Sequence, residues 1–323
     1  MIPNLKMTTQ AIDHLLVIGF GGPPRPEDVK PFPEAVTRGL GIPAARLAEV
    51  ARHYEETGGC SPYNAYASRL VERLAGRLGE MHVSVPLFLG MRNWHPLLSE
   101  TMRAITRQGL QRGVGVILAP HRCDSSFEQY LKNVEDAKAE ASAPDLHYEY
   151  LKPWHDHPLF IQAQADEVRK VFTRIEPPAR SGVHLLFSAH SIPIEMARRS
   201  RYEEEVGASS RLVAEELQAA SWSLAYQSRS GNPRQPWLEP DVPSALRQLK
   251  GQGKRDVLLV PIGFLSDHTE VLYDLDVEAR REAERLGLRC VRASTVMDHP
   301  QFITMLAQLI EIPLLGRPWS VLQ

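Results

Sequence analysis

Six short apolar runs recur along the 323-residue chain, each closed by glycine, proline or polar residues. The runs are HLLVIGFGG from His14, VSVPLFLG from Val83, VGVILAP from Val114, VHLLFSAHS from Val183, WSLAYQS from Trp222 and VLLVPIGF from Val257. They lack the polar alternation of a half-exposed strand, so they predict strands that are covered on both faces. Longer stretches with helical periodicity, such as NAYASRLVERLAGRLGE, lie between them. This alternation predicts parallel sheets joined by right-handed helical crossovers.

The two halves of the chain repeat one another loosely. LLVIGFGGP near the start is similar to LLFSAHSIP in the middle, and GVILAPHRCDS is similar to VLLVPIGFLSDH. In each pair an apolar run passes into a polar turn. A chain of this length also exceeds what one hydrophobic core comfortably fills. The pattern therefore predicts an α/β protein of two similar Rossmann-like domains, residues 11–165 and 166–315, each with a mostly parallel sheet flanked by helices.

Ligands of open α/β sheets bind at the carboxyl ends of the strands. We therefore expect the functional residues directly after GFGG, FLGMRNW, LAPHRCDSS, FSAHS and PIGFLSDH. Two glycine-rich segments do not fit a nucleotide. GFGGPP lacks the GxGxxG spacing and continues into prolines, which have no N–H to offer a pyrophosphate. GQGKR at 251–255 precedes a strand, whereas a phosphate-binding loop follows one.

Composition narrows the classes of function further. The formal net charge of −2 argues against a nucleic-acid partner, because such proteins carry a surplus of Lys and Arg. No apolar run approaches the ~20 residues that cross a bilayer, and the first residues, MIPNLKMTTQ, lack a signal or transit pattern. The three cysteines, at 60, 123 and 290, form no CxxC pair. We expect a reduced, cytoplasmic protein without a membrane anchor.

The strongest chemical signal is a histidine and a row of carboxylates that follow apolar strands. His190 ends the run in FSAHSIP, and LSDHTEVLYDLDVE places Glu270, Asp274 and Glu278 four residues apart. On a helix this spacing makes one acidic stripe, which like-charge repulsion disfavours by roughly a few tenths of a kcal/mol for each pair. A solvated helix face would explain such a stripe. The apolar residues between the carboxylates indicate partial burial instead, and buried carboxylates need a cation or a proton.

An imidazole and a carboxylate from facing strand ends suit two kinds of chemistry. Together they can bind a divalent metal such as Fe2+, since imidazole suits iron and the carboxylate adds negative charge. They can also move protons, because an unperturbed imidazole titrates near pH ~6.5. A lone strand-end histidine would instead hydrogen-bond a neighbouring loop. The residues by themselves indicate metal handling, proton transfer or both.

Five segments in order resemble the ferrochelatase family along nearly the whole chain. They are IGFGGPPRPEDVKPFPEAVTRGLGIP, HYEETGGCSPYNA, FSAHSIP, YQSRSGNPRQPWLEPD and PIGFLSDHTEVLYDLD. The resemblance implies a chelatase-type fold and a lyase of haem biosynthesis that inserts Fe2+ into a porphyrin. Porphyrin and ferrous iron are then its partners as substrates. Insertion releases two pyrrole protons, so this reaction uses both kinds of chemistry.

The resemblance also implies roles for individual residues. The porphyrin is expected in a cleft between the domains, bent out of its plane, with His190 and Glu270 as the catalytic and metal-binding pair. Asp274 and Glu278 are expected to form a path for metal or protons. His268, two residues before Glu270, is expected to act indirectly or to be structural. The porphyrin-binding residues that the match implies are Phe20, Arg38, Met91, Arg92, Asn93, Trp94, Ser125 and Trp237.

GMRNWHP and VTRGLGIP look most like the Gram-positive-type branch of the family, which acts on coproporphyrin III, whereas the other branch uses protoporphyrin IX. Coproporphyrin carries four propionates and protoporphyrin two, so Arg38 and Arg92 are expected to pair with propionates as bidentate donors. The alternative for each arginine is a solvated surface position, and for Phe20, Met91, Trp94 and Trp237 it is core packing. Three cysteines are too few for a four-thiolate iron–sulfur cluster, so we expect no cluster and no other cofactor. We expect a monomer.

Three other classes of function stay open on these residues. A cobalt or nickel tetrapyrrole chelatase would have a similar site. A catalytically silent porphyrin- or haem-binding carrier could share the fold, although His190 and Glu270 are both present. A nucleotide-binding α/β transferase is the third alternative, and the missing phosphate loop disfavours it.

Overall fold

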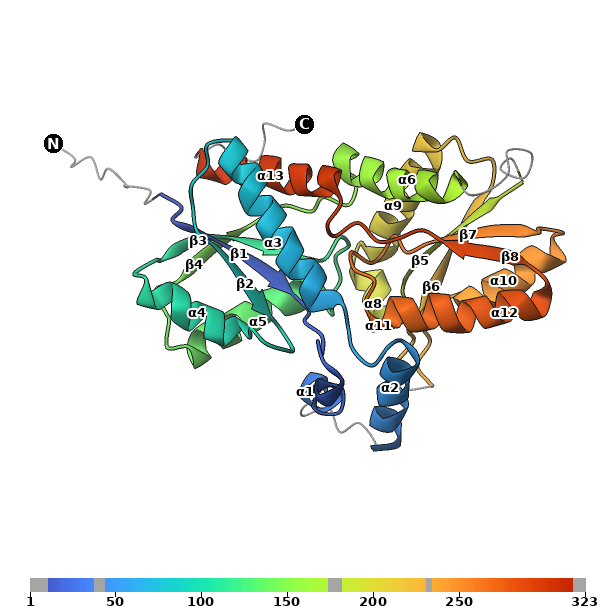
Figure 1. The fold of residues 1–323 in the computed structure, drawn as a ribbon, viewed down its shortest axis with the longest axis horizontal. Helices are drawn as coiled ribbons and strands as arrows, with labels where there is room; N and C mark the ends of the chain where they lie inside the picture. Colours follow the sequence, from blue (N-terminus) through green and yellow to red (C-terminus); the bar gives the residue numbers. More distant parts are fainter. Residues whose placement is uncertain (1–10, 38–43, 174–181, 231–233, 316–323) are drawn as a thin grey trace.

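The computed structural model describes residues 11–37, 44–173, 182–230 and 234–315. Its named strands form two four-stranded parallel sheets, one in each half of the chain (Figure 1). The first sheet has the order β2-β1-β3-β4 and the second the order β6-β5-β7-β8, so both halves use one strand order. The bounds are β1 His14–Gly19, β2 Leu87–Met91, β3 Arg112–Ile117, β4 His147–Tyr150, β5 His184–His190, β6 Trp222–Gln227, β7 Asp256–Val260 and β8 Arg289–Arg292.

The predicted α/β fold with two similar halves is confirmed, and all six apolar runs form strands. β1 is buried at every position and β5 at every position but its last, as expected for strands covered on both faces. The edge strands β4 and β8 were not predicted. In both of them exposed and half-buried positions alternate, so neither HYEY nor RCVR reads as an apolar run.

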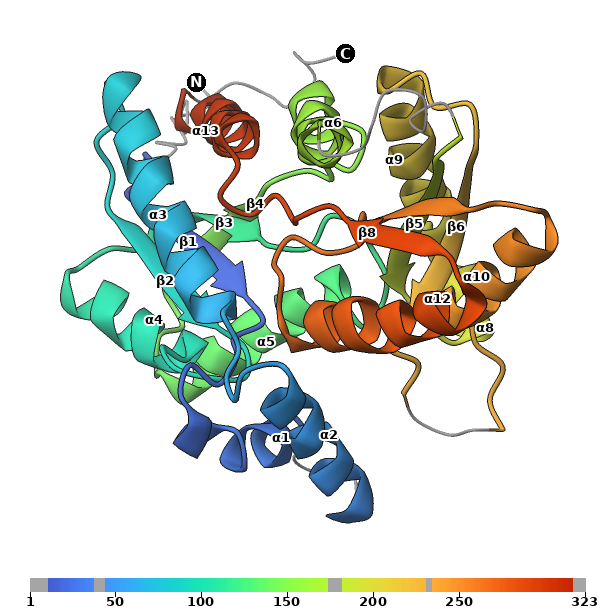
Figure 2. The same ribbon diagram turned by 45° about the vertical axis from the view of Figure 1, so that its right-hand side comes forward.

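Helices follow the strands in both halves. The apolar periodicity of NAYASRLVERLAGRLGE corresponds to α3, as predicted. Helices α1 and α2 project away from the two sheets, and they lie below the sheets in both views (Figures 1 and 2). Among the helices of the described ranges, none has the length and apolar character needed to cross a membrane. The bounds are η1 Pro26–Asp28, α1 Pro31–Val36, α2 Ala44–Glu56, α3 Tyr63–Glu80, α4 Leu98–Arg107, α5 Phe127–Glu140, α6 Pro158–Phe172, α8 Ile194–Arg199, α9 Tyr202–Glu216, α10 Val242–Gly251, α11 Thr269–Val271, the π-helical η2 Leu272–Ala279, α12 Arg280–Leu286 and α13 Pro300–Leu314.

The last helix, α13, ties the two halves together. It packs against α3 of the first half and against α6. The ring of Phe302 on α13 lies 5.4 Å from that of Trp154 and 6.3 Å from that of Phe160, centroid to centroid. One continuous cluster of buried side chains accordingly contains residues of both sheets. The predicted division between residues 165 and 166 falls inside α6, and it stays a prediction.

Gly263 marks a close approach between the segment after β7 and the end of β5. Its N–H donates a hydrogen bond to the carbonyl oxygen of Ser188, at 3.1 Å. A Cβ at this position would lie 2.7 Å from both the Cα and the Cβ of Ala189, next to His190. Backbone atoms cannot yield as a flexible side chain can, so the two segments approach this closely only because residue 263 has no side chain.

We expect Gly263→Ala to lower the free energy of unfolding by about 1–3 kcal/mol, the usual cost of overpacking. Gly207→Ala in the middle of α9 is the matched control, because a Cβ there meets no heavy atom within 4 Å. That control should instead raise the stability by about 0.5–1 kcal/mol, since alanine is the better helix former. Urea unfolding of the three proteins measures both values, and equal effects of the two substitutions would contradict the steric argument.

Candidate active site

A cavity of about 690 Å³ opens between the carboxyl ends of the second sheet and the projecting helices α1 and α2. Both halves of the chain line it, which agrees with the predicted cleft. The first half contributes apolar and aromatic side chains, and the second half contributes most of the polar ones. Those used below are Phe20, Phe32, His53, Tyr54, Gln227, Ser228, His268, Glu270, Tyr273, Asp274 and Glu278.

His190, the last residue of β5, lies beside this cavity with its ring orientation fixed by the backbone. Its Nδ1 lies 2.5 Å from the carbonyl oxygen of Ser191. A carbonyl oxygen can only accept, so Nδ1 carries the proton and Nε2 of the neutral ring has a free lone pair. The backbone is held as well, because the Tyr202 hydroxyl donates to the His190 carbonyl oxygen at 2.8 Å. The strand end therefore presents a basic nitrogen in one orientation.

Glu270 supplies the carboxylate opposite that nitrogen. Its Oε2 lies 4.0 Å from Nε2 of His190 and 3.5 Å from Nε2 of His268. Glu270 is 51% exposed, whereas His268 is largely buried and caps α11, its Nδ1 accepting from the Val271 N–H at 3.4 Å. Burial lowers the pKa of His268, and this favours the neutral ring. His190 and Glu270 thus face each other at the predicted position, and His268 contacts the same carboxylate.

The three predicted carboxylates, Glu270, Asp274 and Glu278, all line the cavity, but the helix that carries them is not an ordinary one. Residues 272–279 are π-helical. In an α-helix each step of four residues turns a side chain by about 40° around the axis, so a four-residue stripe drifts. The wider turn of a π-helix, closed by i→i+5 hydrogen bonds, reduces this drift. The sequence signal for it is the matching four-residue repeat of buried Val271, Leu275 and Ala279.

Asp274 is the most enclosed of the three carboxylates. Its Oδ2 accepts from the Ser228 hydroxyl and from Nε2 of Gln227, the latter at 3.3 Å. Burial raises the pKa of Asp274 to about 7, while the Ser228 hydrogen bond acts in the opposite direction. The charges of Glu270 and Glu278 raise it further. A carboxyl group that titrates near neutral pH can hold or release a proton under working conditions.

The partners of Asp274 were not predicted as site residues. Gln227 ends β6 and Ser228 follows it, so both obey the strand-end rule that located His190. Ser228 also has a positive φ of 59°, a conformation unusual for a residue with a side chain. Burial also raises the pKa of Glu278, and the charge of Asp241 adds to the effect.

Helix α2 contacts the π-helical segment across the mouth of the cavity. The rings of His53 and Tyr273 stack, with centroids 3.6 Å apart and planes 11° from parallel. One helical turn further along, Glu56 Oε2 pairs with Nη2 of Arg281 at 3.0 Å. The aromatic rings of Phe32 and Tyr54 pack edge to face behind this contact, at 6.1 Å. The first half thus contributes an aromatic wall opposite the acidic one.

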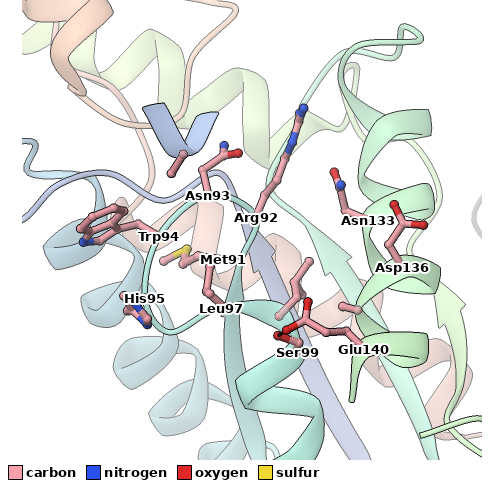
Figure 3. A pocket seen from close by; sticks show the side chains of 13 residues that line it. Met91, Arg92, Asn93, Trp94, His95, Leu97, Ser99, Asn133, Asp136 and Glu140 are labelled. Carbon is pink, nitrogen blue, oxygen red and sulfur yellow. Dashed lines mark hydrogen bonds between the residues drawn. The ribbon is translucent and has the colours of Figure 1, made fainter. Parts of the chain in front are cut away.

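The GMRNWHP segment lines a second, smaller cavity of about 300 Å³ next to α5 (Figure 3). Met91 is fully buried beneath the chain after β1. Asn93 Nδ2 donates to the Phe20 carbonyl oxygen at 3.2 Å, and the Trp94 ring packs against that of Phe32 at 5.7 Å. The segment therefore supports Phe20 and Phe32, which line the larger cavity.

Arg92 of this segment is a partly buried guanidinium whose Cζ lies 5.9 Å from the centroid of the Phe20 ring. Burial lowers its pKa. Among the described residues no carboxylate lies within ion-pairing distance of it. In Figure 3 the side chain of Arg92 extends from the end of β2 into the space between Trp94 and Asn133. A desolvated guanidinium in this position favours an anionic group from a ligand.

The remaining predicted porphyrin contacts differ in position. Phe20 lines the larger cavity. Trp237 is buried and its backbone pairs with Pro193, so it packs under the chain that follows His190. Ser125 is exposed, lines neither cavity, and lies 3.3 Å from Sγ of Cys123 through its Oγ. Arg38 lies outside the described residues. The porphyrin-binding roles of these side chains stay predictions.

Known proteins match this chain over nearly its whole length. The family model described as Ferrochelatase matches residues 13–313. A ferrochelatase of Rhodopirellula baltica is 40% identical over 319 residues, covering 95% of this chain and 90% of the relative. A coproporphyrin III ferrochelatase of Nocardia farcinica is 39% identical over 311 residues, covering 93% and 88%. Among solved structures, SirB from Bacillus subtilis with Fe3+ aligns with a TM-score of 0.58 at 14% identity, covering 93% of this chain and 95% of that one. That last likeness concerns the fold alone and agrees with the predicted chelatase-type fold.

The raised pKa of Asp274 makes stability depend on pH. The carboxyl group binds a proton up to about pH 7 in the folded protein but only up to pH ~3.9 when unfolded, so stability falls as pH rises between these values. Asp274→Asn removes the charge and keeps an acceptor for Ser228. We expect it to raise Tm more at pH 8 than at pH 4. Asp145→Asn, at an exposed turn, is the control and should change Tm equally at both; a pH-independent effect of Asp274→Asn would contradict the assignment.

Proposed function

The chain belongs to the ferrochelatase family, whose members insert ferrous iron into a porphyrin in haem biosynthesis, and from this premise we propose that its porphyrin is coproporphyrin III. The observation that carries the proposed site is the His190–Glu270 pair, with Nε2 and Oε2 4.0 Å apart beside the 690 Å³ cavity. The substrate assignment is supported by the name of the Nocardia relative and by the partly buried, carboxylate-free Arg92.

His190 is proposed to accept the first pyrrole proton. Its Nδ1–H is held by the Ser191 carbonyl oxygen, so Nε2 is the only basic nitrogen that the ring can offer. Proton transfer turns the ring into an imidazolium ion. The carboxylate of Glu270, 4.0 Å away, stabilises that cation as it forms. Positioned acid–base groups of this kind typically accelerate a reaction by about 10²–10⁴-fold.

Glu270 is proposed to meet the incoming Fe2+ substrate, and Asp274 and Glu278 to line the way to it. A half-exposed carboxylate next to two imidazoles offers the oxygen and nitrogen donors that suit ferrous iron. Asp274, with its pKa raised to about 7, can take up the second pyrrole proton near neutral pH. Each Fe2+ that enters the macrocycle displaces two protons. His190 accepts the first of them and Asp274 the second.

The porphyrin is proposed to lie between the aromatic wall of the first half and the acidic wall of the second. Phe20 presents its ring to the cavity, and Asn93 and Trp94 support the chain around it. Pressure on one side of the macrocycle would bend it and expose pyrrole lone pairs to the metal. Contacts remote from the reacting atoms can supply strain of about 1–5 kcal/mol for this purpose.

The decisive test is the anaerobic loss of free-porphyrin fluorescence with Fe2+, offering coproporphyrin III and protoporphyrin IX separately at equal concentration. We expect fast loss with coproporphyrin III only. Fast loss with protoporphyrin IX would keep the enzyme and overturn the proposed porphyrin. Binding of both porphyrins without any loss of fluorescence would overturn the proposed catalytic site in favour of a carrier.

His190→Ala should lower kcat by about 10³-fold, since it removes the proposed proton acceptor. The fold should persist, because the substitution leaves the Tyr202 and Ser191 backbone contacts in place. His147→Ala removes an imidazole from the exposed edge strand β4 and is the matched control. Anaerobic turnover and far-UV circular dichroism are measured for both variants, and His190→Ala with most of the wild-type kcat would refute the role.

Arg92→Ala should raise KM for coproporphyrin III by about tenfold, because a charge-assisted hydrogen bond to a buried group contributes about 1.5–3 kcal/mol. KM for protoporphyrin IX, with two propionates fewer, should change less. Arg107→Ala, at the exposed end of α4, is the control and should leave both values unchanged. Steady-state kinetics with the two porphyrins check this, and equal changes in both KM values would argue against a role of Arg92 in substrate choice.

A further inference from the structure

Arg292 binds two carboxylates with one guanidinium at the end of β8. Its Nε and Nη2 donate to the two carboxylate oxygens of Asp276, both at 2.7 Å. Its Nη1 donates to Oδ1 of Asp267 at 2.7 Å and to the carbonyl oxygen of Ala293 at 3.0 Å. The side chain is only 14% exposed, and neither it nor its two acidic partners lines the cavity.

The two acidic partners belong to the two segments that carry the proposed iron-handling groups. Asp267 immediately precedes His268 and lies three residues before Glu270. Asp276 lies within the π-helical segment, two residues after Asp274. One guanidinium therefore links the loop before Glu270 to the π-helical segment that carries Asp274, from outside the cavity. Within the described residues, no other side chain forms ion pairs with both of these segments.

A π-helical segment of eight residues needs support from its surroundings. Such helices are rare, usually extend over a single turn inside an α-helix, and are found frequently at functional sites. Buried Val271, Leu275 and Ala279 anchor one side of the segment in the core. The bidentate pair of Arg292 and Asp276 adds a directional contact, which fixes the rotation of the segment about its axis as well as its distance from β8.

The chemistry of this contact depends on the guanidinium shape. A planar fork can serve Asp276 with two parallel hydrogen bonds and still donate to Asp267, whereas an ammonium is a point charge without that geometry. Removing the arginine would leave Asp267, whose side chain is 13% exposed, and Asp276, which is 40% exposed, without their cation. The buried carboxylate of Asp267 must then move toward water or take up a proton.

We propose that Arg292 is a positioning residue for iron insertion: it fixes the π-helical turn and the loop before it, and thereby holds Glu270 and Asp274 in place opposite His190. The inference rests on the proposed roles of Glu270 and Asp274. Arg292 then affects the insertion of Fe2+ without contacting either the metal or the porphyrin. A purely stabilising ion pair would change Tm and leave the kinetics of the folded enzyme as they are.

The same strand supplies a matched control. Arg289 begins β8 and pairs with Asp256 at the opposite end of the strand, where it is exposed. Arg289→Met removes an arginine–aspartate pair of similar chemistry far from the π-helical segment. Surface substitutions of this kind typically change free energies by no more than ~0.5 kcal/mol, so its kinetic constants should stay within about twofold of wild type.

The test compares Arg292→Lys, Arg292→Met, Asp276→Asn and Arg289→Met by anaerobic turnover with Fe2+ and coproporphyrin III. We expect the first three to lower kcat by about tenfold or more and to raise KM for Fe2+, because a displacement of ~1 Å in a catalytic group can cost up to about a hundredfold. KM for the porphyrin and its binding, followed by fluorescence, should stay within about twofold. If Arg292→Met does not fold, Arg292→Lys and Asp276→Asn carry the test.

The double variant Arg292→Met/Asp276→Asn separates positioning from stability. It removes one uncompensated carboxylate, so Tm should recover relative to Arg292→Met, while kcat should stay low because the clamp is still absent. Folded Arg292 variants with wild-type kcat and KM for Fe2+ would overturn the inference. Glu270→Gln is measured alongside: loss of activity there with active Arg292 variants refutes only the inference, whereas an active Glu270→Gln refutes the proposed site and the inference with it.

Discussion

The apolar side chains of Val271, Leu275 and Ala279 pack into the core of the second sheet, and the turn that keeps them there also sets the acidic wall of the cleft. In an α-helix a spacing of four residues would rotate each successive side chain by about 40° around the axis. The π-helical turn holds the buried row and the neighbouring carboxylates in register together. The position of Glu270 and Asp274 is thus a consequence of how the same segment buries its opposite side.

The frame opposite that segment is set by the parallel sheets. The strands of the second sheet are parallel and end at one edge, and β5 lies between β6 and β7. The order of the strands alone therefore brings His190, Gln227 and the segment after β7 together. Gly263 brings the segment after β7 against Ala189 at a distance that no other residue would allow. The ring of His190 is then oriented by a backbone carbonyl, which cannot rotate away as a side chain could. Rigid elements hold both members of the proposed pair, as catalytic geometry demands.

The parts of this arrangement that depend on local sequence pattern could be predicted. Continuous apolar runs predicted the buried strands, and the strand-end rule located His190 and Glu270. The edge strands β4 and β8 escaped because one of their faces is exposed, so HYEY and RCVR carry no apolar run. The π-helical turn escaped because a four-residue repeat over three positions also fits a drifting α-helical stripe. Other contacts join residues that are distant in sequence, and no local pattern encodes them. They are the hydrogen bonds of Gln227 and Ser228 to Asp274, the packing of α13 on the first half, and the ion pairs of Arg292.

In the part of the chain that the structure describes, the carboxylates of the acidic segment have cationic partners outside the cavity but not on the side that lines it. Arg292 pairs with Asp267 and Asp276 outside the cavity, and Glu282, the next residue of the four-residue repeat after Glu278, pairs with Arg247 and Arg285. Within the described residues, no lysine or arginine pairs with Glu270, Asp274 or Glu278 on the cavity side. A carboxylate that is enclosed without a cation, as Asp274 is, must hold a proton or attract a metal. Asp274 titrates near pH 7, and Glu270 lies beside two imidazoles, so carboxylates without a partner cation among the described residues line the cavity where, in the proposed mechanism, a divalent metal enters and two protons leave.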